Sequence, residues 1–111
     1  FAQGLICEAT VNRCKMSLTD LTLKIAPATA ADVTLILNLI RELADYEQMT
    51  EEVMVTEADL QRSLFSATPF AEAVIARLDS TPVGFALFFH SFSTFVGRRG
   101  LYLEDLFVRP A

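Results

Sequence analysis

Two adjacent acids, Glu104 and Asp105, stand inside the otherwise apolar segment "LYLEDLFV" near the end of the 111-residue chain. Carboxylates can hold an ammonium group or accept a proton from it, because both tasks need a negatively charged oxygen close to the nitrogen. Neighbouring side chains of a strand point to opposite faces, so both acids can serve one site only if a β-bulge re-aims one of them. In the simpler interpretation, Glu104 is an edge-strand charge that discourages aggregation.

A second concentration of acids precedes this segment. Seven acids and no basic residue lie between Arg41 and Arg62, namely Glu42, Asp45, Glu47, Glu51, Glu52, Glu57 and Asp59. One interpretation is a solvated face of the protein. The other is a surface that attracts an organic cation, because like charges gathered in a concave region raise the local concentration of the opposite ion.

Helical periodicity predicts the elements that carry the acidic run. Residues 30–46 form an expected helix, with Thr29 and Asp32 spaced as a capping box. A second helix is expected after Thr56, with Asp59 in the equivalent capping position. The apolar positions expected to be buried are Val33, Ile36, Leu37, Ile40 and Leu43 in the first helix, and Leu60 and Leu64 in the second.

Strand patterns flank these helices on both sides. Residues 21–27 alternate apolar and polar side chains and end at a proline. The apolar runs "FAEAVIARLD" and "PVGFALFFHSF" are joined by the short turn "DSTP", which predicts an antiparallel hairpin. The loop "SFSTFVGRRG" and a last strand over residues 101–108 complete the order of one strand, two helices and three strands, a mixed α and β fold.

The composition indicates a single globular domain. Hydrophobic residues make up 52% of the chain, and its apolar runs are too short to span a bilayer. Both cysteines, Cys7 and Cys14, fall in residues 1–15, a leader that we expect not to be part of the native fold, although a short amphipathic helix is the alternative. The domain is therefore expected to occupy residues 16–111, with a cysteine-free core suited to a reducing compartment, the cytoplasm.

Three segments, "IAPATAADVTLILNLIRELADYEQM", "PFAEAVIARLDSTPVGFALFF" and "STFVGRRGLYLEDLFVRPA", together resemble the amino-terminal half of a GNAT-fold N-acetyltransferase. The similarity is greatest to the diamine branch, which includes the spermidine/spermine and thialysine acetyltransferases, and "LYLEDLFVRP" is its most specific part. The resemblance implies an α/β fold with a mixed sheet and a bulge in the last strand. In this family a glycine-rich loop and a helix for the pyrophosphate of acetyl-CoA follow that strand, so the chain is expected to be a partial domain.

The resemblance also implies roles for individual residues. Glu104 corresponds to the acid near the reacting nitrogen, and Tyr46, Glu47, Ser93 and Asp105 correspond to the amine site. The strand backbone that pairs with the pantetheine of acetyl-CoA corresponds to Leu106, Phe107 and Val108. Ser93 departs from the family, because polyamine-using relatives usually carry an acid there, and "FSTF" is nearer to the thialysine-type pattern "YSTW".

The implied function of the full-length protein is acetyl transfer from acetyl-CoA to a primary amine of a small polyamine-like or thialysine-like molecule. We expect no metal, nucleic-acid or membrane partner, a homodimer if the protein is full length, and no activity from this part alone. The alternative is a small α/β binding or interaction module without catalysis, or an inactive fragment.

Overall fold

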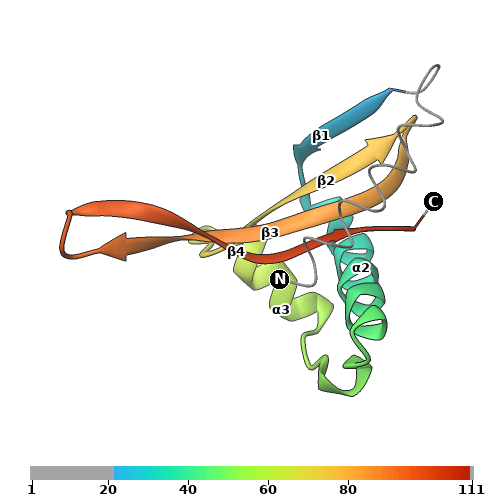
Figure 1. The fold of residues 1–111 in the computed structure, drawn as a ribbon, viewed down its shortest axis with the longest axis horizontal. Helices are drawn as coiled ribbons and strands as arrows, with labels where there is room; N and C mark the ends of the chain where they lie inside the picture. The colour runs from blue at the N-terminus through green and yellow to red at the C-terminus, as the bar shows by residue number, and fades with distance from the viewer. Residues whose placement is uncertain (1–21, 111) are drawn as a thin grey trace.

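The computed structural model describes residues 22–110, so the predictions for the leader lie outside the described residues (Figure 1). The predicted order of one strand, two helices and three strands is confirmed. The elements are β1 (Leu23–Pro27), η2 (Ala30–Asp32), α2 (Val33–Tyr46), η3 (Thr50–Glu52), α3 (Glu57–Phe65), β2 (Glu72–Leu78), β3 (Thr81–Ser93) and β4 (Arg98–Val108).

The four strands form one sheet in the order β1-β2-β3-β4, with α2 and α3 together on one face (Figure 1). Every pairing among the described strands is antiparallel. The core lies between this face and the helices, where Ile75, Phe85 and Phe107 of the sheet are buried with Ile36 and Leu39 of α2. β4 is the last strand of the described sheet, so one of its ladder sides is open there.

Both helices begin as their capping residues predict. The Asp32 carboxylate accepts a hydrogen bond of 2.8 Å from the Thr29 backbone N–H, although the first turn is the 3₁₀ segment η2. At α3 the Asp59 backbone N–H donates to the Thr56 hydroxyl at 3.1 Å, and the Asp59 carboxylate accepts from the Thr56 N–H at 2.9 Å. The buried stripe of α2 is as predicted except that Leu39 is buried and Ile40 only partly.

The β2–β3 hairpin is confirmed, but the long loop predicted after it is wrong. Asp79 and Ser80 have φ values of 49° and 71°, the backbone of a two-residue type I′ turn. β3 continues to Ser93 and β4 begins at Arg98, so the expected loop is mostly strand. The residues paired there include Ser91, Ser93, Arg98 and Arg99. Their mixed polar sequence lacks the sustained alternation of apolar and polar side chains that predicts a strand. We call residues 90–101 the hairpin arm, and it projects beyond the helices (Figure 1).

β3 and β4 approach each other closely at Gly84. A Cβ atom at this position would lie 2.6 Å from the Phe107 carbonyl oxygen, a separation that real Cβ atoms essentially never show. Glycine therefore lets the two backbones run side by side just after the two acids. In residues 22–110 neither helix has the length and apolar character that a membrane crossing requires.

Candidate functional site

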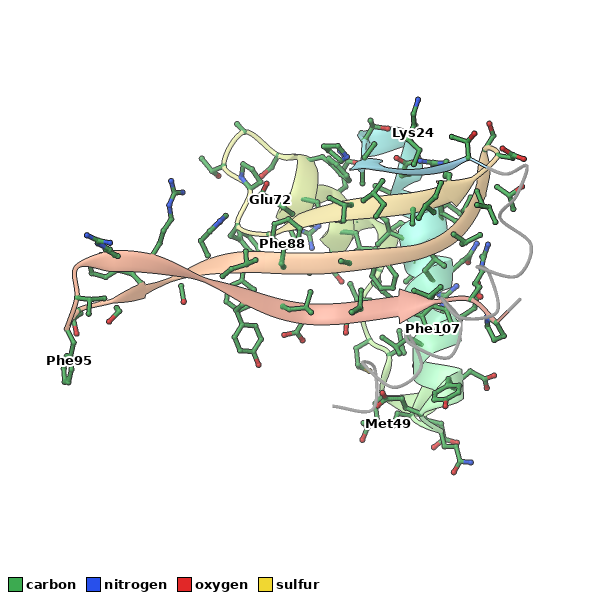
Figure 2. The ribbon with its side chains drawn as sticks, turned by 45° about the horizontal axis from the view of Figure 1, so that its top comes forward. Lys24, Met49, Glu72, Phe88, Phe95 and Phe107 are labelled. Atoms are coloured by element: carbon green, nitrogen blue, oxygen red, sulfur yellow. The ribbon has the colours of Figure 1, made fainter. Side chains whose placement is uncertain are left out.

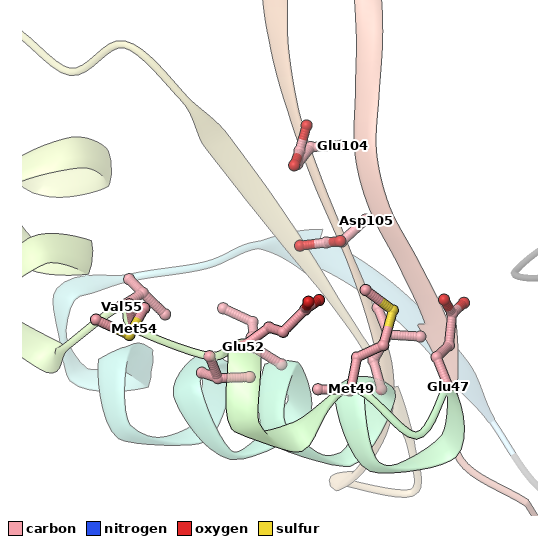
Figure 3. A pocket seen from close by; sticks show the side chains of 11 residues that line it. Glu47, Met49, Glu52, Met54, Val55, Glu104 and Asp105 are labelled. Carbon is pink, nitrogen blue, oxygen red and sulfur yellow. The ribbon is translucent and has the colours of Figure 1, made fainter.

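A β-bulge in β4 places the two adjacent acids. Leu87 pairs with Asp105 and Phe88 pairs with Leu103, so Glu104 is the extra residue of β4. The bulge implied by the resemblance is therefore present. Because a bulge breaks the strict alternation of side chains, Glu104 and Asp105 both reach the same cavity (Figure 3).

This cavity, which we call the acidic hollow, has a volume of about 520 Å³ and lies between β4 and the end of α2. Four carboxylates meet in it: Glu47, Glu52, Glu104 and Asp105. Its remaining walls are mainly apolar: Ile40, Leu43, Ala44, Met49, Val53, Met54 and Val55. Within residues 22–110 no Lys, Arg or His lines it. The arrangement suits a cation that carries an apolar chain.

The chain reversal after α2 brings two of the four carboxylates to β4. Glu47 ends the helix, and its backbone N–H donates to the Leu43 carbonyl at 3.1 Å. Gln48 then turns the chain with a φ of 59°, and the short segment η3 carries Glu52 back toward β4 (Figure 3). Sequence reasoning assigned no role to Glu52. The acidic run in the sequence includes Glu52, but the run alone does not indicate which of its acids face β4.

The other members of the acidic run have structural partners or face solvent. Glu42 accepts hydrogen bonds of 2.9 and 2.6 Å from the Arg109 guanidinium, whose pKa rises because of this pairing. Glu57 accepts from the Thr34 hydroxyl at 2.9 Å. Glu51 is exposed and does not line the acidic hollow. The run therefore divides: Glu47 and Glu52 line the acidic hollow, and its other members have structural partners or face solvent.

The surroundings of Asp105 in the acidic hollow shift the pKa of its carboxyl. Its burial raises the pKa of its carboxyl above the ordinary value, and the negative charges of Glu104 and Glu47 raise that pKa further. A carboxylate with a raised pKa holds a proton more readily, and a nearby cation would relieve the repulsion between the acids. The electrostatics at Asp105 therefore favour either a nearby cation or a proton on its carboxyl.

The open edge of β4 continues past these acids. The Arg109 N–H donates to the Val83 carbonyl at 2.6 Å, so its backbone is directed toward β3. Backbone direction alternates along an antiparallel strand, which turns the N–H and C=O groups of Leu106 and Val108 toward the open edge. Phe107 lies between them with its side chain in the core, 3% exposed. Of these three residues, Leu106 and Val108 are the ones with backbone groups available to a ligand.

The structure does not bring Tyr46 or Ser93 into the acidic hollow. Tyr46 precedes Glu47 but is 56% exposed and is not part of the cavity wall. Ser93 pairs with Arg98 near the tip of the hairpin arm, roughly 20 Å along β3 from Leu87. Figure 2 shows Phe95 at that tip, well away from Met49, which lines the acidic hollow.

Two curated relatives have names that fit this chemistry. The chain is 39% identical over 94 residues to "Thialysine N-epsilon-acetyltransferase" of Bos taurus. This match covers 78% of the chain and 55% of the relative. It is 36% identical over 95 residues to "Spermidine/spermine N(1)-acetyltransferase-like protein 1" of Homo sapiens, covering 79% of this chain and 14% of that one. The chain thus spans about half the length of the thialysine-type relatives it matches. No family model matches it.

Solved structures share the fold at low sequence identity. A ribosomal-protein-alanine N-acetyltransferase from Brucella melitensis biovar Abortus 2308 superposes with a TM-score of 0.61 at 22% identity, over 79% of this chain and 57% of that one. An aminoglycoside acetyltransferase from an uncultured soil metagenomic sample, solved with sisomicin, superposes with a TM-score of 0.63 at 22% identity. The match covers 78% of this chain and 56% of that one. These likenesses concern the arrangement of the sheet and helices.

Proposed function

We propose, from the premise that this chain belongs to the diamine branch of the GNAT N-acetyltransferases, that the whole protein acetylates a primary amine of a small polyamine-like or thialysine-like molecule. The observation that carries the proposal is the bulge at Glu104, which gathers two carboxylates of β4 and two of the α2–α3 connection in one cavity. This cavity adjoins the open strand edge at Leu106 and Val108.

The chemistry requires a neutral amine. An alkylamine with a pKa of about 10.4 is neutral in only about one molecule in 2,500 at pH 7. A carboxylate that simply holds the ammonium would raise that pKa further, so the tasks of holding and deprotonating are best divided between groups. The acidic hollow has enough carboxylates for both tasks.

We assign proton removal to Glu104, acting directly or through a water molecule, with Asp105 beside it on the substrate. The raised pKa of Asp105, caused by its burial and by the neighbouring charges, means that this carboxyl holds a proton more readily than an ordinary aspartate. Glu47 and Glu52 lie on the opposite wall, where they can hold a second cationic group of the substrate.

The described residues also fit the acetyl donor at the open edge of β4. When bound, acetyl-CoA supplies an activated acetyl thioester. The outward N–H and C=O groups of Leu106 and Val108 can pair with the amide groups of its pantetheine arm, as an added strand would. An outward N–H can also donate to a carbonyl oxygen that gains negative charge during the reaction. Phe107 supports this edge through its buried side chain.

Further features of the proposal concern the whole protein. A homodimer is supported by the exposed apolar side chains of the hairpin arm, Phe92 at 68% and Phe95 at 99%. In such a dimer Ser93 could act on the amine site of a partner subunit, and Tyr46 could cover the entrance of the acidic hollow. A cytoplasmic protein is supported by the absence of cysteine from residue 15 onward in the sequence.

The whole protein should release free thiol from acetyl-CoA in the presence of thialysine or spermidine. Thiol release should stop when the primary amines of the substrate are already acetylated, because no primary amine nitrogen is then left to attack the thioester. A measurable comparison is the rate of thiol release with each matched pair of amine and acetylated amine. Binding of the amines without any turnover would contradict the proposal and favour the binding module.

A further inference from the structure

A second cavity adjoins the acidic hollow and differs from it in character. This apolar hollow has a volume of about 630 Å³, within the usual range of small-molecule sites. It shares Ile40, Val55 and Asp105 with the acidic hollow. Its other walls include Ser63 of α3 and Leu87 and Phe89 of β3. The two hollows therefore meet at one carboxylate, that of Asp105.

The walls of the apolar hollow are suited to hydrocarbon. Phe89 stacks on Tyr102 with ring centroids 4.9 Å apart and planes at 25°, which gives a flat aromatic surface on the helix side of the sheet. Leu87 precedes it by two residues on the same face and packs against the core. Within residues 22–110 the carboxylate that lines this hollow is Asp105, and the other titratable side chain in its wall is His90, whose Nδ1 lies 3.5 Å from the Glu72 carboxylate.

We propose that the apolar hollow holds the hydrocarbon chain of the acceptor amine when the amine nitrogen lies at Asp105. This inference rests on the proposed function and specifies the substrate class of the same site. The carboxylate selects a cation at the junction, and the adjoining walls select what the cation carries. A second ammonium would lose hydration in the apolar hollow, where within residues 22–110 no carboxylate other than Asp105 lines the wall, so a diamine should extend into the acidic hollow instead.

The proposal extends the accepted substrates beyond diamines. An alkylamine with one nitrogen and an apolar tail would extend from Asp105 into the apolar hollow. A diamine would extend from the same carboxylate toward Glu47 and Glu52. The junction at Asp105 thus sorts amines by the polarity of the chain attached to the nitrogen.

Calorimetric titrations of the protein with ethylamine and hexylamine, without acetyl-CoA, test the proposal. Each methylene that enters the apolar hollow should tighten binding roughly three- to fourfold, so hexylamine should bind at least about tenfold more tightly than ethylamine. Equal affinities for the two amines would overturn the proposal. Since no acetyl transfer takes place, failure of the proposed function would not alter this ratio.

Matched leucine substitutions on α3 locate the effect. Ser63→Leu should project an isobutyl group into the apolar hollow and lower the ratio of the two affinities. Ala58→Leu adds the same side chain at an exposed position of the same helix and should leave the ratio as in the unmodified protein. If Ser63→Leu fails to fold, Phe89→Ala removes a wall and should also lower the ratio. A folded variant of either wall residue with an unchanged ratio would refute the assignment.

Discussion

Replacing Glu104 with Gln is expected to lower kcat/KM of the whole protein at pH 7 by about 10² to 10⁴, the usual contribution of a general base. Gln keeps the size of the side chain and most of its hydrogen bonding, and it leaves the extra residue of the bulge in place. The variant therefore loses the basic oxygen and little else. The loss should shrink as the pH rises toward the pKa of the substrate, because more of the amine then arrives neutral from bulk water.

A control for this variant is Glu51→Gln, which removes the same charge from an exposed member of the acidic run outside the acidic hollow. Its pH profile should match that of the unmodified protein. Asp105→Asn, measured in parallel, separates the two neighbouring acids. A Glu104→Gln protein with an unchanged profile at every pH would reduce Glu104 to an edge-strand charge.

Replacing Glu47 with Gln should have a different effect, one that depends on the substrate. If Glu47 holds the distal ammonium of a diamine, its loss removes a charge-assisted hydrogen bond, which corresponds to about ten- to hundredfold in kcat/KM. A monoamine of equal length has no distal ammonium and should lose much less. The measurement is the ratio of kcat/KM for 1,6-diaminohexane and hexylamine in both proteins.

This second variant also distinguishes charge recognition from general damage to the acidic hollow. Glu47 caps the end of α2, so a structural effect of the substitution would lower activity toward both amines alike. Equal losses for the diamine and the monoamine would therefore contradict a distal binding role. The thermal midpoint of the variant, compared with that of Glu51→Gln, reports any loss of fold.

Local patterns were sufficient to predict most of the fold. The helix periodicity, the Thr56 capping box and the turn at Asp79 and Ser80 all act over a few residues, and each is present in the structure. The hairpin arm was missed because its strands are held by pairing across the turn, and the mixed polar sequence around Ser93 and Arg98 gives no hydrophobic face to detect.

The candidate site depended more on contacts between distant segments. The adjacent acids required a bulge if they were to share a site, and the family resemblance implied one, but its position at Glu104 is set by pairing with β3. Glu52 was not singled out because its approach to β4 depends on the backbone turn at Gln48 and on η3. The raised pKa of Asp105 likewise comes from burial and from Glu47, which lies far away in sequence.

The most direct measurement is the titration of the Asp105 carboxyl by ¹³C NMR, with and without 1,6-diaminohexane. In the free protein, burial and the neighbouring carboxylates should hold the pKa of Asp105 above its ordinary value. A bound ammonium favours the ionised carboxylate, so saturating diamine should lower that pKa. A pKa of Asp105 that does not change with the diamine would contradict the claim that the acidic hollow binds the acceptor amine.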